Sequence, residues 1–156
     1  MSKSFLILLL LALALLPSLA ADDELVGALT RETLFEKNPE WQAVAAAYQP
    51  KPDCVEKLRA LALEVKVEIY LGTWCSDSKA HVSEYFKVME MADTPLIQTA
   101  CTGIPEDKDK RASFYRGKDI TKLPTFLVFI DGREAGRIVE TPDKSVEEDL
   151  VRILGL

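Results

Sequence analysis

Residues 65–78 read VKVEIYLGTWCSDS, and this stretch decides how the rest of the chain is interpreted. From Val65 to Leu71, apolar residues alternate with polar ones, which is the two-residue period of a β-strand with one buried face. Gly72 and Thr73 end that period. A helical period of apolar residues then runs from near Ser76 to about Met91. The sequence therefore predicts a strand that leads directly into a long helix.

A second informative stretch, residues 122–130, reads KLPTFLVFI. Thr125 to Ile130 predicts a strongly apolar strand. The next two residues are Asp-Gly, the strongest short signal for a two-residue hairpin turn, so residues 133–140 are expected to form the return strand. Ser145 and Glu148 have the spacing of a capping box and predict a final helix.

The remaining segments complete the predicted order of elements. We expect a helix from Pro39 to about Tyr48 and a second helix capped by Asp53. A short strand at Leu96–Ala100 and a polar stretch at residues 102–118, with a short helix inside it, should follow. Strand, helix, strand and hairpin in this order are typical of an α/β domain with a mixed sheet and helices on both faces.

Two pieces of this sequence together resemble the thioredoxin superfamily. One is the strand that runs into Trp74-Cys75 at a helix start, and the other is Leu123-Pro124 before an apolar strand and an Asp-Gly hairpin. The resemblance covers residues 53–156 and implies a thioredoxin-like three-layer fold in which Pro124 is cis and faces Cys75. Residues 21–52 lie outside the minimal fold and look like the N-terminal helical extension of exported thiol–disulfide oxidoreductases.

Cys75 is the predicted reactive group. A cysteine at a helix N-terminus meets unpaired backbone N–H groups and the positive end of the helix dipole. Both favour the thiolate, which is the reacting form of cysteine. We expect Trp74 to shield one side of the sulfur. Asp77 opposes thiolate formation because like charges repel, and Lys79 offsets part of that effect.

Ser78 is a departure from the pattern of the resembling family, which places a second cysteine there to release the substrate. A serine cannot form that disulfide, although it can donate a hydrogen bond to the Cys75 thiolate. Three routes stay open: exchange with an external thiol, shuffling of substrate disulfides, or resolution by another cysteine of this chain. Trp74, Leu123 and Pro124 are the residues that the resemblance assigns to substrate binding.

Cys54 and Cys101 are the other two cysteines. Cys101 follows the strand after the Cys75 helix, and Cys54 begins the helix before Val65. If that strand is parallel to its neighbour and that helix is antiparallel to it, all three cysteines reach one edge of the sheet. Cys54 and Cys101 are then either a structural disulfide or unpaired thiols, or one of them resolves adducts of Cys75.

The first 20 residues have the pattern of a cleaved signal peptide. Lys3 supplies a positive charge, residues 5–16 are an unbroken apolar run, and small residues stand at Ser18 and Ala20. The run is too short for a membrane-spanning helix, which needs about 20 apolar residues. We therefore expect a secreted or periplasmic protein, in which residues 21–52 are the extension and 53–156 the thioredoxin-like domain.

The net negative charge of the chain argues against two classes of binding partner. Loss of the leader would take the net charge from −6 to −7. An acidic domain argues against nucleic acid and against stable association with anionic membranes, because both need clustered Lys and Arg. No cofactor is predicted. The single histidine, His81, is expected at the surface, and its spacing from Cys75 matches no standard zinc pattern.

The functional hypothesis from the sequence is thiol–disulfide exchange through one thiol, Cys75, outside the cytoplasm. Its substrates would be protein thiols and disulfides or low-molecular-weight thiols. The alternative is a redox-inactive binding module that keeps the thioredoxin surface and docks peptides on Trp74, Leu123 and Pro124. Reactivity of Cys75 separates the two hypotheses.

Overall fold

The computed structural model describes residues 24–156 of the chain. The predicted signal peptide, residues 1–20, lies outside the described residues. The elements in chain order are β1 (Gly27–Leu29), α1 (Arg31–Lys37), α2 (Pro39–Ala47), α3 (Pro52–Arg59), β2 (Val65–Leu71), α4 (Ser76–Ala92), β3 (Ile97–Gly103), η1 (Lys108–Lys110), α5 (Ala112–Tyr115), β4 (Thr125–Ile130), β5 (Arg133–Val139) and α6 (Val146–Leu154). No helix among these is long and apolar enough to cross a membrane.

The strands form one mixed sheet in the order β1-β3-β2-β4-β5. β2 and β3 are parallel, while β1, β4 and β5 are each antiparallel to the strand beside them. Leu71 at the end of β2 lies opposite Gly103 at the end of β3, and Tyr70 lies opposite Thr125 at the start of β4. These three strand ends meet at one edge of the sheet, which we call the Cys75 edge. The predicted α/β fold with a mixed sheet is confirmed.

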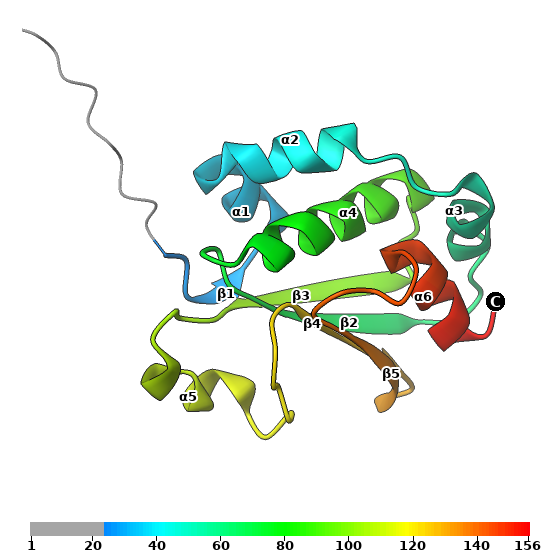
Figure 1. Cartoon of the computed structure of the whole chain (residues 1–156). Helices are drawn as coiled ribbons and strands as arrows, with labels where there is room; N and C mark the ends of the chain where they lie inside the picture. The colour runs from blue at the N-terminus through cyan, green and yellow to red at the C-terminus, as the bar shows by residue number, and fades with distance from the viewer. Residues whose placement is uncertain (1–23) are drawn as a thin grey trace, which may run out of the picture.

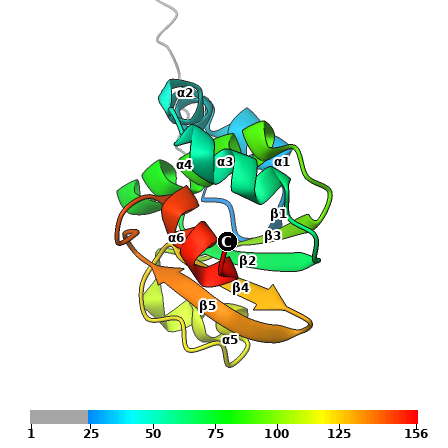
Figure 2. The same ribbon diagram turned by 90° about the vertical axis from the view of Figure 1, so that its right-hand side faces the viewer.

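Helices cover the two faces of the sheet unequally. The helices α1, α2, α3, α4 and α6 lie on one face, and the short α5 lies on the other (Figures 1 and 2). The larger core cluster joins the helical side to alternate residues of β2, including Val65, Val67 and Ile69. A smaller cluster around Tyr70 and Leu127 lies under α5. Part of the second sheet face therefore has no helix over it.

The β4–β5 hairpin turns where the sequence predicts it. Asp131 and Gly132 have φ values of 50° and 74°, the left-handed conformation that both central residues of a type I′ turn require. The capping box is also present at the start of α6, because the Ser145 hydroxyl accepts a hydrogen bond from the Glu148 backbone nitrogen. At α3 the prediction was wrong by two residues: Lys51 is the N-cap, and Asp53 lies within the first turn.

The N-terminal extension contains a strand as well as helices. β1 pairs with the last three residues of β3, and α2 packs along α4. Neither β1 nor α1 was predicted. The extension is also tied to the last helix: the buried Glu147 carboxylate accepts hydrogen bonds from the Tyr48 hydroxyl at 2.8 Å and the Lys51 backbone nitrogen at 3.0 Å. Burial and this contact with Glu147 raise the pKa of Tyr48.

Candidate functional site

Cys75 occupies the N-cap of α4 at the Cys75 edge. Its extended backbone turns the chain from β2 into the helix, with its nitrogen donating to the Gly72 carbonyl at 3.0 Å and its carbonyl accepting from the Lys79 nitrogen at 3.0 Å. The side chain therefore lies at the first turn of α4, where backbone N–H groups have no partner inside the helix. The thiol donates to the Leu123 carbonyl oxygen at 3.6 Å. The Leu123–Pro124 peptide bond is cis, as the resemblance implied.

Ser78 is fully buried one turn into α4. Its hydroxyl oxygen accepts a hydrogen bond from the backbone nitrogen of Gly72 at 3.1 Å. No hydrogen bond joins Ser78 to Cys75 among residues 24–156. The contact observed for Ser78 is thus with the turn that carries Cys75, and it holds the end of β2 against the first turn of α4.

Trp74 is held in place beside the thiol from two sides. Its indole N–H donates to the Ile104 carbonyl at 2.9 Å, and the Arg111 guanidinium lies 4.8 Å from the centre of its ring. Arg111 is itself fixed by the Pro105 and Glu106 carbonyls. The side chain is still 38% exposed. Trp74 therefore presents a fixed aromatic surface to solvent next to Cys75.

Gly72 is required where Trp74 folds back over the chain. A Cβ atom on Gly72 would lie 2.6 Å from the Cε2 atom of Trp74, well inside van der Waals contact. The glycine at this position is therefore needed for space rather than for a left-handed conformation.

Leu123 and Pro124 differ from what was expected of a docking patch. Both side chains are buried, with Leu123 only 7% exposed and packed in the smaller core cluster under α5. The part of Leu123 that reaches the site is its backbone carbonyl. Of the three residues predicted to bind substrate, only Trp74 offers a side chain to a partner.

A hollow of about 390 Å³ opens beside the thiol. Two segments of the N-terminal extension contribute to it. The backbone nitrogen of Leu25 donates to the Thr73 hydroxyl at 3.2 Å, which brings Glu24 to the rim, and Glu40 comes from the first turn of α2. The complete lining is Glu24, Glu40, Thr73, Trp74, Cys75, Ser76, Lys79 and Glu106.

Cys54 lies away from this hollow, so the prediction that three cysteines share one edge was wrong. α3 lies where β2 begins, whereas α4 begins at the opposite end of the sheet (Figure 1). Cys54 lines a separate hollow with residues of α6. The two hollows lie toward opposite ends of α2. Glu40 in its first turn lines one, and Tyr48 at its C-cap bonds to Glu147 of α6, the helix that lines the other. Glu40 and Tyr48 are about 12 Å apart along the helix axis at 1.5 Å per residue.

Cys101 is a buried thiol in the sheet. It lies opposite Ile69 of β2 and Leu29 of β1, is 7% exposed, and belongs to the core beneath the helices. Burial raises its pKa to about 12, and burial also raises the pKa of Cys54, with the Glu147 carboxylate adding to the effect. All three cysteines are free thiols. Cys54 and Cys101 are therefore not joined in a structural disulfide: Cys54 lines the hollow beside α6, whereas Cys101 lies opposite Ile69 in the sheet.

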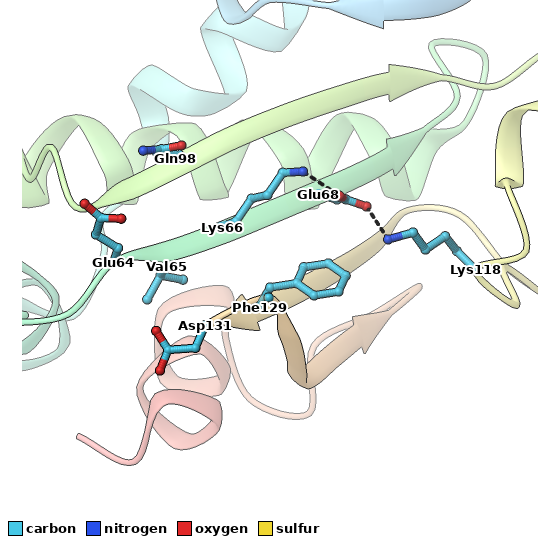
Figure 3. A pocket seen from close by; sticks show the side chains of 9 residues that line it. Glu64, Val65, Lys66, Glu68, Gln98, Lys118, Phe129 and Asp131 are labelled. Carbon is cyan, nitrogen blue, oxygen red and sulfur yellow. Dashed lines mark hydrogen bonds and ion pairs between the residues drawn. The ribbon is translucent and has the colours of Figure 1, made fainter.

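His81 and the charged groups of the open sheet face lie outside the site. His81 pairs with Glu84 one turn along α4 at 2.8 Å. On the face opposite α4, Glu68 bonds to both Lys66 and Lys118 in a hollow of about 300 Å³ beside Phe129 (Figure 3). Glu68 is thus paired with two ammonium groups. No group of three potential metal ligands is found in the described part of the chain.

Sequence reasoning missed the carboxylates of the Cys75 hollow. Glu24, Glu40 and Glu106 come from the segment before β1, from α2 and from the loop after β3. No motif marks them, because only the packing of these segments on the Cys75 edge brings them together. Arg111 was missed for the same reason.

Comparisons with known proteins report on the fold. No family model matches the chain, and no curated protein is significantly similar. An HIV epitope scaffold and PA1234 of Pseudomonas aeruginosa, a protein of unknown function, each superpose with a TM-score of 0.51 at 15% identity. Both matches cover 75% of this chain, and they cover 72% and 69% of the respective structures.

A mitochondrial thioredoxin 3 from Saccharomyces cerevisiae matches at a TM-score of 0.42 and 19% identity over 67% of this chain and 88% of its own. Identities this low concern the fold alone. The mixed sheet, the position of Cys75 at the start of the helix after β2, and a cis proline before β4 agree with what the sequence and its resemblance predicted. The fold is thioredoxin-like.

Proposed function

We propose that this protein carries out thiol–disulfide exchange through the single thiol of Cys75, outside the cytoplasm, on protein or low-molecular-weight thiols. The position of that thiol supports the proposal. It lies at the N-cap of α4, it opens into a hollow, and it is 3.6 Å from the Leu123 carbonyl oxygen. A cysteine used only for packing would be expected inside the core, as Cys101 is.

The first step conserves electrons. The Cys75 thiolate attacks one sulfur of a substrate disulfide, that S–S bond breaks, and a mixed disulfide forms on Cys75 while the other substrate sulfur leaves as a thiolate. The proton of Cys75 passes to water beforehand, and the leaving thiolate takes one up afterwards. Trp74 and the Leu123 carbonyl flank the reacting sulfur and limit the direction of approach.

The second step needs a thiolate from another molecule. Ser78 has no thiol, Cys54 lines a separate hollow beside α6, and Cys101 is buried. The incoming thiolate attacks the mixed disulfide and regenerates Cys75. The proposal is therefore a one-thiol cycle, in which adducts persist until an external thiol arrives.

Acid quenching followed by non-reducing mass spectrometry tests this cycle. Protein quenched from its own compartment should carry mixed disulfides on Cys75. Cys75→Ser should abolish these adducts, while Cys54→Ser, which removes the other partly exposed thiol, should leave them unchanged. Ser78→Cys should shorten adduct lifetime and create net disulfide reductase activity, because the new thiolate lies within the same turn of helix.

Two results would contradict the proposal. One is the absence of adducts combined with alkylation of Cys75 no faster than in the urea-unfolded chain, which would favour a redox-inactive binding module. The other is retention of adducts in Cys75→Ser, which would move the chemistry to another thiol. The proposed export rests on residues 1–20, and N-terminal sequencing of the mature protein tests it.

A further inference from the structure

We propose that the Cys75 hollow selects thiols and disulfides that carry positive charge close to the reacting sulfur. This inference rests on the proposed exchange function and names its substrate class. The hollow contains three carboxylates, from Glu24, Glu40 and Glu106, and one ammonium group, from Lys79. An ordinary exchange site needs only the thiol and its backbone surroundings, so the charge of this lining calls for a separate explanation.

The carboxylates are brought to the thiol by three separate segments. Glu24 arrives on the segment that crosses the Cys75 edge, where its carboxylate accepts a hydrogen bond from the Glu106 backbone nitrogen. That segment is packed so closely that a Cβ on Gly103 would lie 2.1 Å from the Leu25 carbonyl oxygen. Glu40 arrives on α2. Two parts of the N-terminal extension thus add negative charge beside the thiol.

These carboxylates are available to a substrate. None of the ion pairs within residues 24–156 involves Glu24, Glu40 or Glu106, and all three side chains are exposed. The nearby guanidinium of Arg111 is directed to the Pro105 and Glu106 carbonyls and to the Trp74 ring. An incoming cation would therefore meet three carboxylates, of which the Lys79 ammonium group in the same lining can offset one.

Trp74 gives independent support for a cationic ligand. It lines the same hollow, its side chain is 38% exposed, and it already accepts the Arg111 guanidinium 4.8 Å from its ring centre. An exposed indole attracts ammonium and guanidinium groups through its ring quadrupole. Carboxylates and an indole around one nucleophile form a lining suited to cations and unfavourable to anionic thiols.

Small disulfides of matched shape test the proposal. Cystamine carries two ammonium groups, bis(2-hydroxyethyl) disulfide is neutral, and 3,3′-dithiodipropionate carries two carboxylates. The second-order rate constant for forming the Cys75 mixed disulfide is measured for each by mass spectrometry. Each value is divided by that of 2-mercaptoethanol with the same disulfide, which removes the intrinsic reactivity of the reagent.

We expect a normalised preference for cystamine over 3,3′-dithiodipropionate of at least about tenfold at low salt, since one lining charge about 7 Å away in water-like surroundings changes a rate about threefold and acts in opposite directions on the two reagents. The preference should shrink in 0.5 M NaCl because salt screens exposed charges. Glu40→Gln and Glu106→Gln should each reduce it, by up to about tenfold, because each removes one charge that acts in opposite directions on the two reagents. Glu64→Gln is the matched control: it makes the same change in net charge beside the start of β2, in the hollow of Figure 3, and should leave the preference unchanged.

The positively charged substrate could be a basic protein segment or a small cationic thiol, and peptides distinguish the two. Blocked peptides with Cys between two Lys or between two Glu are used to release the 2-hydroxyethylthio adduct of Cys75. A faster release by the Lys peptide assigns the site to basic protein segments, and equal release with a preference for cystamine assigns it to small cationic thiols. Reaction with all three disulfides at normalised rates within twofold overturns the inference alone. No reaction of Cys75 with any of them overturns the proposed exchange as well.

Discussion

The Ser78 hydroxyl lies 3.1 Å from the backbone nitrogen of Gly72 and accepts a hydrogen bond from it. Ser78, which stands where the resembling family has a second cysteine, therefore stabilises the turn that carries Cys75. Ser78→Ala would leave the buried Gly72 N–H without an acceptor, so we expect a loss of about 1–3 kcal/mol in the free energy of unfolding. Urea unfolding monitored by circular dichroism measures it.

Ser83→Ala is the matched control for this prediction. Ser83 is also fully buried in α4, but its hydroxyl has no hydrogen-bond partner within residues 24–156. Removing an unpaired buried hydroxyl should leave stability unchanged or raise it. Equal losses in the two variants would show that the Gly72–Ser78 hydrogen bond makes no specific contribution.

Gly72→Ala should displace Trp74. The new methyl group would lie 2.6 Å from the indole, so the ring must move and give up its hydrogen bond to Ile104. We expect a red-shifted fluorescence component, greater quenching by acrylamide, and a loss of about 1 kcal/mol of stability. Trp74→Phe supplies the spectrum of Trp41 alone for subtraction. An unshifted Trp74 component would contradict the predicted collision.

The buried thiol of Cys101 should make the protein less stable in alkali. Its pKa is raised to about 12 in the folded state, against about 8.5 for an ordinary cysteine, so above pH 8.5 the unfolded chain releases a proton that the folded chain retains. Stability from this group is complete below pH 8.5 and falls as pH rises, by about 2 kcal/mol at pH 10.

Cys101→Ala tests the alkaline effect. The stability that the variant loses through poorer packing is the same at both pH values and cancels in the comparison. The quantity compared is the difference in unfolding free energy between pH 7 and pH 10, which should be about 2 kcal/mol smaller in the variant than in the wild type. Cys75→Ala serves as the control because Cys75 is partly exposed. A variant with an unchanged pH slope would rule out Cys101 as the source.

The Tyr48–Glu147 hydrogen bond should couple the N-terminal extension to α6. Glu147 is 1% exposed and accepts from the Tyr48 hydroxyl at 2.8 Å. In a double-mutant cycle with Tyr48→Phe and Glu147→Ala, we expect a coupling energy of about 1.5–3 kcal/mol, the range for hydrogen bonds to charged groups. The exposed pair Arg31–Glu90 is the control and should couple by less than about 1 kcal/mol. Similar values for the two pairs would contradict a special role for Glu147.

The strands with a clear period were predictable to the residue. β2 and β4 have the bounds that their apolar patterns indicated, because each buries side chains that its own sequence specifies. β1 was not predictable, since a three-residue strand has no period of its own and forms by pairing with β3. β3 continues three residues beyond its predicted end for the same reason, because β1 and the end of β2 supply its partners.

The candidate site was predictable where it lies within a local motif. Cys75 at the N-cap of α4 follows from one short stretch of sequence, and the cis Leu123–Pro124 bond is what the family resemblance of a second stretch implied. The placement of Cys54 failed because α3 is short and packs against both α4 and α6, so the antiparallel rule for helices and strands did not locate its N-terminus. The acidic lining of the Cys75 hollow was not predicted, because it depends on the long-range packing of the N-terminal segments.

The bond between Tyr48 and Glu147 spans 99 residues of sequence, and it has a consequence for biosynthesis. Translation proceeds from the N-terminus, so Tyr48 and Lys51 are made long before the helix that receives their hydrogen bonds. β1 likewise cannot pair until β3 has been synthesised. The first segments of the domain to be synthesised are thus among the last to reach their final contacts, because a non-local contact forms only after the intervening chain has been closed into a loop. Until α4 and β3 exist, the carboxylates that the extension carries to Cys75 have no surface on which to pack.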